Sequence, residues 1–249
     1  IQGTIISTSN YCSPLSSSTC TTTSTTMGMV LGKISVEEPA FKVLFNRATT
    51  TPASNVSNTT TTPYEIRKYG KRYAIESIYD STNGDRSPFM ALAGYIGVTK
   101  APENESNESI AMTAPVAIDR KEGDNKRMKF ILPSKYDDIS KIPQPKNYNK
   151  VSIREMAPAV GAVHQFSGAF DDSHCEEKAR ALAAQLIRDG ISLPTGEDGE
   201  VELGKVNFEW WGYNPPFTIP MLRRNEVWIE LTEEQVNELI GTKGEEASE

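Results

Sequence analysis

The chain has 249 residues, enough for one large domain or two small ones with a buried core. Its formal net charge of −7 argues against nucleic acid as a default partner, because phosphate binding needs a basic surface. No apolar run approaches the roughly 18 residues that cross a bilayer, so we expect a soluble protein without a transmembrane segment.

The first part of the chain has a strongly biased composition. Residues 1–26 contain fifteen Ser or Thr, and the first acidic residue is Glu37. Such a segment cannot bury much apolar surface, so we expect a disordered head over residues 1–35. A hydroxyl-rich, acid-poor segment is also typical of the end of an organellar transit peptide, although Arg is absent from it. Plastid and cytoplasmic locations therefore both stay open.

Short apolar runs predict three strands in the next part of the chain. The first is Phe41–Phe45, followed by a Thr/Ser/Asn/Pro-rich tract over residues 48–63 that we interpret as a surface-loop insertion. Tyr64–Tyr69 and Tyr73–Tyr79 flank a break at Gly70, which predicts that they pair as a hairpin.

A short helix is expected next. Phe89, Leu92, Ala93 and Ile96 have the i, i+3, i+4, i+7 spacing of one helix face, and Gly97 is a suitable cap. Two further strands are then expected, Ile110–Ile118 and its antiparallel partner Met128–Leu132. Pro115 lies within the first of them and indicates an edge or a bulge.

The second half repeats this order after a Pro-containing linker, Pro133–Lys150. Its strongest local signal is a capping box, Ser173 to Glu176, which opens a helix that ends at Gly190. The strands expected around this helix are Val151–Glu155 and Val160–Phe166, paired as a hairpin, and then Val206–Trp210 and Val227–Leu231. Residues 232–249 are expected to form a polar tail with no more than a turn or two of helix.

The order strand, strand, helix, strand, strand therefore occurs twice, which indicates an internal pseudo-repeat. Two such units can close by pairing their edges, which would remove exposed strand edges. We predict an α+β fold with one domain over residues 36–231. It is a pseudo-twofold distorted antiparallel β-barrel flanked by two α-helices.

Four segments, in this order and at this spacing, carry a resemblance to a known family. They are Tyr64–Tyr69, Ile110–Val116 (IAMTAPV), Phe166–Gly168, and the stretch YNPPFTIPMLRRNEVWIEL that ends at Leu231. Together they resemble the SOUL family of haem-binding proteins over about residues 36–231, most closely its plant and algal branch. The resemblance implies a fold like that of bacterial effector-binding domains. It also implies non-covalent binding of haem or a related tetrapyrrole for buffering, transport or delivery, and it admits a haem-using enzyme as partner.

With this resemblance, the first helix becomes the expected ligand site. A flat macrocycle with two carboxylates needs an apolar floor and a basic clamp. The helix face that contains Phe89, Leu92, Ala93 and Ile96 can supply the floor, and Arg86 can supply the clamp. Spacing alone favours the alternative that this face packs on the sheet and that Arg86 is solvated. The Pro-stiffened loop around Pro215 either shapes the rim of a pocket or is an ordered crossover. The candidate ligand-binding residues are Arg86, Phe89, Met90, Leu92, Ala93, Ile96, Met112, Tyr213 and Phe217.

Few residues are suited to hold a metal. Met90 and Met112 carry thioethers that can bind haem iron, but Met is more often a core filler. His164 lies among apolar neighbours in a strand, where a hydrogen-bonded structural histidine is more common than a ligand, and we expect His174 to be exposed. The three cysteines have no metal-binding spacing, so no protein metal site is predicted.

Two other classes of function stay open. No nucleophile or phosphate-binding motif occurs, so no catalytic residue is assigned and we expect no enzyme activity. A dechelatase or ester hydrolase acting on a tetrapyrrole would need a general acid or base, for which Glu76, Tyr95 and Glu209 are the candidates. A partner-binding scaffold without ligand could use the acidic loop over residues 197–202.

Overall fold

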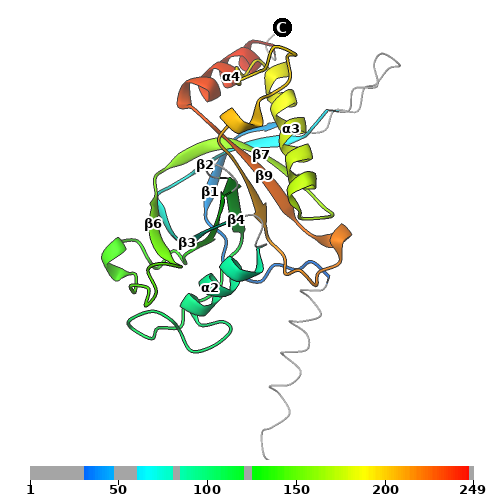
Figure 1. The fold of residues 1–249 in the computed structure, drawn as a ribbon. Coiled ribbons are helices and arrows are strands. Elements are labelled where there is room, and N and C mark those ends of the chain that lie inside the picture. The colour runs from blue at the N-terminus through cyan, green and yellow to red at the C-terminus, as the bar shows by residue number, and fades with distance from the viewer. Residues whose placement is uncertain (1–30, 48–60, 81–84, 121–124, 247–249) are drawn as a thin grey trace, which may run out of the picture.

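The computed structural model describes residues 31–47, 61–80, 85–120 and 125–246 (Figure 1). The expected head over residues 1–30 and most of the expected loop insertion, residues 48–60, lie outside the described residues. The elements are β1 (Phe41–Arg47), β2 (Tyr64–Tyr69), β3 (Arg72–Asp80), α2 (Arg86–Ile96), β4 (Val116–Arg120), β5 (Asn125–Ile131), β6 (Ser152–Met156), β7 (Ala159–Phe166), α3 (Asp172–Arg188), β8 (Phe208–Gly212), β9 (Asn225–Leu231) and α4 (Glu233–Glu246).

The strands form one curled antiparallel sheet in the order β1-β2-β7-β9-β8-β4-β5-β3-β6. The two halves of the sheet meet between β8 and β4 and are related by a pseudo-twofold symmetry. The strands β4-β5-β3 on one side correspond to β8-β9-β7 on the other. This confirms the predicted α+β barrel-like class. The barrel is a half-barrel rather than a closed one, since no ladder in the described residues joins the edge strands β1 and β6.

Both predicted hairpins are wrong. β2 pairs with β1 and β7, whereas β3 pairs with β5 and β6. The chain turns a corner after Tyr69, and it turns the equivalent corner between Met156 and Ala159. Each half thereby gives its first strand to the other half, β2 to β7 and β6 to β3. Local sequence cannot reveal this exchange, because the partner strands are about 80 to 100 residues apart along the chain.

The strand predicted over Ile110–Ile118 is shorter than expected. Regular pairing begins only at Val116, and the Ala114–Pro115 peptide bond is cis. Proline has no N–H to donate to a ladder, which is why the sheet starts after it. Upstream of it, Thr113 forms an isolated parallel bridge with Glu37, and the Ala114 N–H donates to the Glu37 carbonyl at 2.9 Å.

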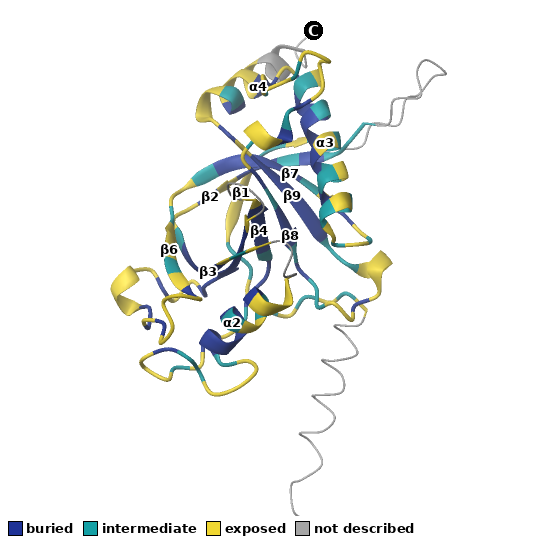
Figure 2. Ribbon diagram, in the orientation of Figure 1, coloured by how far each residue is buried: buried dark blue, intermediate teal, exposed yellow. Residues whose placement is uncertain are grey.

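The helices cover the outer, convex side of the sheet (Figure 1). α2 packs on β3 and β5, and α3 packs on the equivalent strands β7 and β9. Their buried stripes join the alternate strand residues in the main core (Figure 2). The other face of the sheet carries a smaller cluster in which Trp211 and Trp228 stack at 5.4 Å with Tyr69 edge-on to both.

The predicted capping box of the second helix is wrong. The N-cap of α3 is Asp171, whose carboxylate accepts the backbone N–H of His174 at 2.9 Å. Ser173 lies inside the first turn and is exposed. Asp171 can cap because its backbone is extended, which aims its side chain at the free amides of the first turn.

Segments near both ends of the described chain pack against the sheet. Ile34 and Val36 pack against the aromatic cluster on the inner face of the sheet. At the other end, α4 is a 14-residue helix, longer than expected, and its Val236 and Leu239 are buried in the main core. Apolar residues three apart on α4 therefore attach the C-terminal segment to the body of the protein.

Candidate ligand-binding site

The predicted apolar side of α2 exists in the structure, but it packs against the sheet. Leu92, Ala93 and Ile96 are at most 2% exposed and belong to the main core. Phe89 is partly buried, with its ring edge-on to Phe130 at 5.3 Å between centroids. In this structure these side chains contact strands, so a site on α2 has to use the opposite side of the helix.

Two loops form a wall beside that opposite side. α2 ends at Gly97, which has a left-handed φ of 83° as the cap position requires. The following loop is organised by Asn104, a fully buried residue whose amide donates to the carbonyls of Tyr95 and Glu108 and accepts the N–H of Glu108, all within 2.9 Å. Asn104 also bridges to Pro145, which joins this loop to the segment 143–151.

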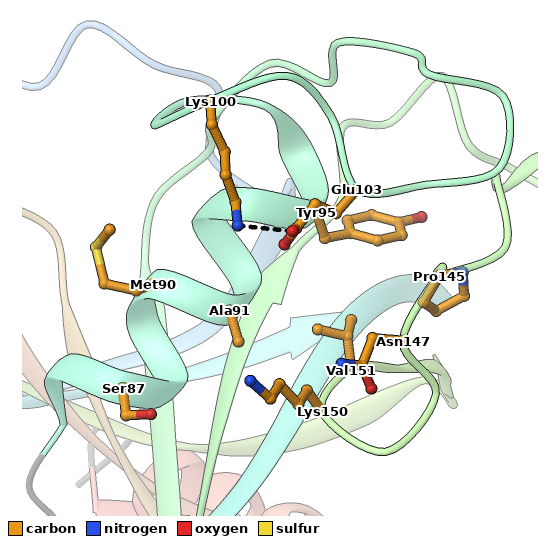
Figure 3. Close-up of a pocket in the computed structure, with 10 residues that line it drawn as sticks. All are labelled: Ser87, Met90, Ala91, Tyr95, Lys100, Glu103, Pro145, Asn147, Lys150 and Val151. Carbon is orange, nitrogen blue, oxygen red and sulfur yellow. Dashed lines mark ion pairs between the residues drawn. The ribbon is translucent and has the colours of Figure 1, made fainter.

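The space between helix and loops is a pocket of about 250 Å³ (Figure 3). Tyr95 and Ala91 from α2 face Pro145, Asn147 and Val151 from the second loop. The full lining is Ser87, Met90, Ala91, Tyr95, Lys100, Glu103, Pro145, Asn147, Lys150 and Val151. The walls are a mixture of apolar and polar groups, as in pockets that orient an amphipathic ligand.

Two lysines of the pocket differ in their partners. Lys100 forms an ion pair with Glu103 at 2.6 Å, on the rim of the pocket. Lys150 is exposed, and its ammonium group has no carboxylate within 4 Å among the described residues. In Figure 3 its side chain extends toward α2 near Ser87 and Ala91. Lys150 is therefore the pocket cation that is available for an anionic group of a ligand.

Tyr95 is a structural member of the pocket. Its hydroxyl donates to the Pro143 carbonyl at 2.6 Å, and burial, together with the nearby Tyr136 and Glu108, raises its pKa well above the usual range. The phenol therefore stays protonated at ordinary pH. It fastens the second loop to the helix and presents its ring to the pocket.

The other predicted helix residues divide between pocket and core. Met90 lines the pocket and is 43% exposed. Arg86 is the exposed first residue of α2 and is not part of the pocket lining, whereas Lys150 is. Met112 is partly buried and packs against the main core, as a filler does.

The two residues predicted in the Pro-rich loop do not line this pocket. Tyr213 is buried on the inner face, where its hydroxyl donates to Glu226 at 2.8 Å and Arg224 lies over its ring. Phe217 is 58% exposed on the same loop, which Arg223 braces by donating to the carbonyls of Thr218 and Pro216. The structure thus does not bring these residues together with the α2 side chains.

The candidate acids and bases are held in other interactions. Glu76 lies beside Arg127 and Arg154, at 3.4 and 3.7 Å. Burial alone would raise the pKa of Glu209, but its pairing with Lys129 and the Trp211 N–H holds the pKa below its usual value. Neither of these two glutamates lines the α2 pocket.

Both histidines lie in the second half of the molecule. His164 Nδ1 is 2.7 Å from the Pro63 carbonyl, and burial lowers its pKa, as expected for a structural histidine. His174 is partly buried at the start of α3, edge-on to Phe166. Within the described ranges, no group of three or more His, Cys, Asp or Glu residues could hold a metal ion. Across the same residues, no helix is long and apolar enough to span a bilayer.

The structure is thus an α+β half-barrel with a small pocket of mixed polar and apolar lining against one helix. Residues 36–230 match the model of the family described as SOUL heme-binding protein. The match covers most of the chain, so this protein belongs to the SOUL family. The predicted family is thereby confirmed, and its plant and algal branch stays a prediction. No curated protein matches the chain.

Solved structures with a similar course of the chain have low sequence identity. The C-terminal domain of EcmrR has a TM-score of 0.45 and 12% identity, and the match covers 68% of this chain and 96% of that domain. A hydrolase from Listeria innocua has a TM-score of 0.44 and 9% identity, with 70% and 94% of the two chains covered. At these scores the similarities carry no functional implication.

Sequence reasoning missed most of the pocket because loops supply it. Residues 133–150 read as a surface linker, yet Pro145, Asn147 and Lys150 form one wall. Asn104 gives no signal in sequence, since a polar loop rich in Asn, Glu and Ser is ordinarily solvated. Only its burial in the folded chain shows that it organises the loop.

Proposed function

We propose that this protein binds haem or a related tetrapyrrole without a covalent bond, for buffering, transport or delivery, at the α2 pocket. Membership of the SOUL family carries the proposal. The pocket adds support, because apolar and aromatic side chains lie next to one cation without an ion partner among the described residues, Lys150. That combination suits a flat apolar ring with peripheral carboxylates.

The size of the pocket limits how the ligand is held. A volume of about 250 Å³ is below the roughly 300–1,000 Å³ of ordinary ligand pockets, so one edge of the macrocycle enters and the rest lies over the surface. Tyr95 and Val151 would contact the inserted edge, and Lys150 would pair with a propionate. Met90, exposed at the opening, would be the candidate thioether ligand of the iron.

A haemin titration followed in the Soret band tests the proposal. Lys150→Gln should weaken binding by about 1–3 kcal/mol, because it removes one charge-assisted contact with a propionate. Lys42→Gln is the matched control, since Lys42 on β1 is another exposed lysine without an ion pair among the described residues and lies outside the pocket. Equal affinities of the two variants would contradict the assignment to α2, and no binding by the wild type would contradict the function.

We also propose binding rather than turnover. Support comes from the binding character of the family and from the ion pairs that occupy Glu76 and Glu209. Incubation with haemin or a chlorin ester, followed by chromatography, should return the tetrapyrrole unchanged. A new product whose yield grows with protein concentration would favour the dechelatase or esterase alternative.

Two further parts of this proposal are the protein that receives the ligand and the cellular compartment. We propose that a haem-using enzyme receives the ligand. Transfer of haem from the loaded protein to an apo-peroxidase would test this. The hydroxyl-rich residues 1–26 favour a plastid, with the cytoplasm as the alternative. Imaging a fluorescent fusion of the chain in a plastid-containing cell decides between them.

A further inference from the structure

A second cleft lies away from the α2 pocket, and none of the proposed haem contacts lines it. Its volume is about 500 Å³, within the range of ordinary ligand sites. Apolar groups from two parts of the chain line it, namely Pro39, Ala40, Ile131, Leu132 and Pro133. The rings of Tyr73 and Tyr136 complete the lining.

The wall formed by residues 37–40 is attached to the body of the protein at several points. The Glu37 carbonyl accepts the Ala114 N–H, and the Glu37 carboxylate accepts the Ser134 N–H at 2.7 Å. Glu38 pairs with Arg224 at 2.8 Å. These bonds fix residues 37–40 at a distance from the corner that joins β2 to β3. The cleft between them is therefore a defined feature of the folded chain.

The charges around the cleft are mostly neutralised by neighbours. Lys71 pairs with Glu155 at 3.2 Å, and Asp137 pairs with Lys141 at 2.7 Å. Arg72 differs, because its guanidinium has no carboxylate within 4 Å among the described residues. Its polar partner is the Gly70 carbonyl at 3.2 Å, and its guanidinium lies over the Tyr69 ring at 4.8 Å.

We propose that this cleft binds an amphipathic carboxylic acid, with the apolar body against the Pro39–Ala40 wall and Leu132 and the carboxylate paired with Arg72. A guanidinium binds a carboxylate through two parallel hydrogen bonds, which a partly buried, unpaired arginine can form without breaking an existing ion pair. Burial lowers the pKa of Arg72, and its attraction to Glu209 opposes that effect. A bound carboxylate would replace the solvation that burial removes.

Fluorescence titration of the full chain with 1-pyrenebutyrate tests this site. The wild type should bind the probe at one saturable site, and Arg72→Gln should weaken binding by about 10- to 100-fold, the range for a lost charge-assisted contact. Lys71→Gln is the matched control, because Lys71 is the neighbouring cation but already has a partner; its affinity should change by less than about threefold. Equal affinities of Arg72→Gln and wild type would overturn the proposal.

Three further measurements keep the test decisive if Arg72→Gln does not fold. Ala40→Trp fills the cleft from an exposed position and should abolish binding. Neutral 1-pyrenebutanol and cationic 1-pyrenemethylamine should bind the wild type at least about tenfold more weakly than pyrenebutyrate. Unchanged binding to Ala40→Trp, or tighter binding of the alcohol or the amine, would refute the site or its preference for an acid.

The site is also distinguishable from the proposed haem pocket. Lys150→Gln should leave pyrenebutyrate affinity unchanged, and saturating haemin should not displace the probe. Displacement by haemin together with loss of haemin affinity in Arg72→Gln would show that the cleft is the tetrapyrrole site, which overturns a separate acid site. Failure of haemin to bind at all would contradict the haem proposal and leave pyrenebutyrate binding as a separate result.

Discussion

α2 and α3 occupy equivalent places in the two halves, and they differ in what covers their outer sides. Both bury an apolar stripe on the sheet, through Leu92 in α2 and Leu182 in α3, each fully buried. The outer side of α2 is walled by two loops that Asn104 and Tyr95 fasten together, which leaves a pocket. The outer side of α3 instead carries charged residues such as Glu177 and Lys178, paired with each other at 2.9 Å.

The difference shows that the loops of one half can form a pocket against a helix that is otherwise equivalent to its counterpart. The stripe on each helix is a folding feature, because its partners are strands in both halves. The site depends on residues that have no counterpart in the pseudo-repeat, above all the segment 143–151. The pocket thus lies where the pseudo-twofold relation is broken.

Removal of a stripe residue should have the largest effect on stability and the same effect in both halves. Leu92→Ala and Leu182→Ala should each lower the free energy of unfolding by about 2–5 kcal/mol, because each leaves a cavity in the main core. Urea denaturation measures this. If Leu92→Ala kept full stability but lost haemin, the α2 stripe would be a ligand floor, and the equivalence of the two helices would fail.

Substitution of Asn104, which organises the loop after α2, should affect the pocket of the first half specifically. Asn104→Ala leaves the carbonyls of Tyr95 and Glu108 and the Glu108 N–H without their partner, so we expect a loss of about 2–3 kcal/mol and weaker haemin binding. Asn225→Ala is the control, because this buried amide has only long contacts of 3.4 and 3.5 Å. The control should lose less stability and keep its haemin affinity; the reverse order would mean that the loops do not form the site.

The smallest effect should come from the helix caps. Asp171→Ala should cost about 1 kcal/mol, because it removes the acceptor for the His174 N–H at the start of α3. Ser173→Ala should leave the urea midpoint nearly unchanged. α2 offers the contrast, since its N-cap Asp85 makes no capping bond and accepts the Tyr79 hydroxyl instead. A larger loss of stability for Ser173→Ala than for Asp171→Ala would show that Ser173 is the cap, as the capping box in the sequence predicts.

The sequence by itself determined the number and type of most elements. Apolar periodicity identified the stripes of α2 and α3, and Gly97 was identified as a cap, because these features depend on neighbours a few residues away. The ordered family motifs determined the family and, with it, the fold class. Apolar stripes alone could not say whether they meet a ligand or a sheet.

Only the tertiary structure decided that question and the pairing of the strands. β2 joins β7 and β3 joins β6 across many intervening residues, and no local signal encodes such contacts. The same holds for the pocket and the cleft. Lys150 and Arg72 resemble many solvated cations in the sequence, and they stand out because folding places apolar walls beside them and leaves each without a carboxylate partner in the described part of the chain.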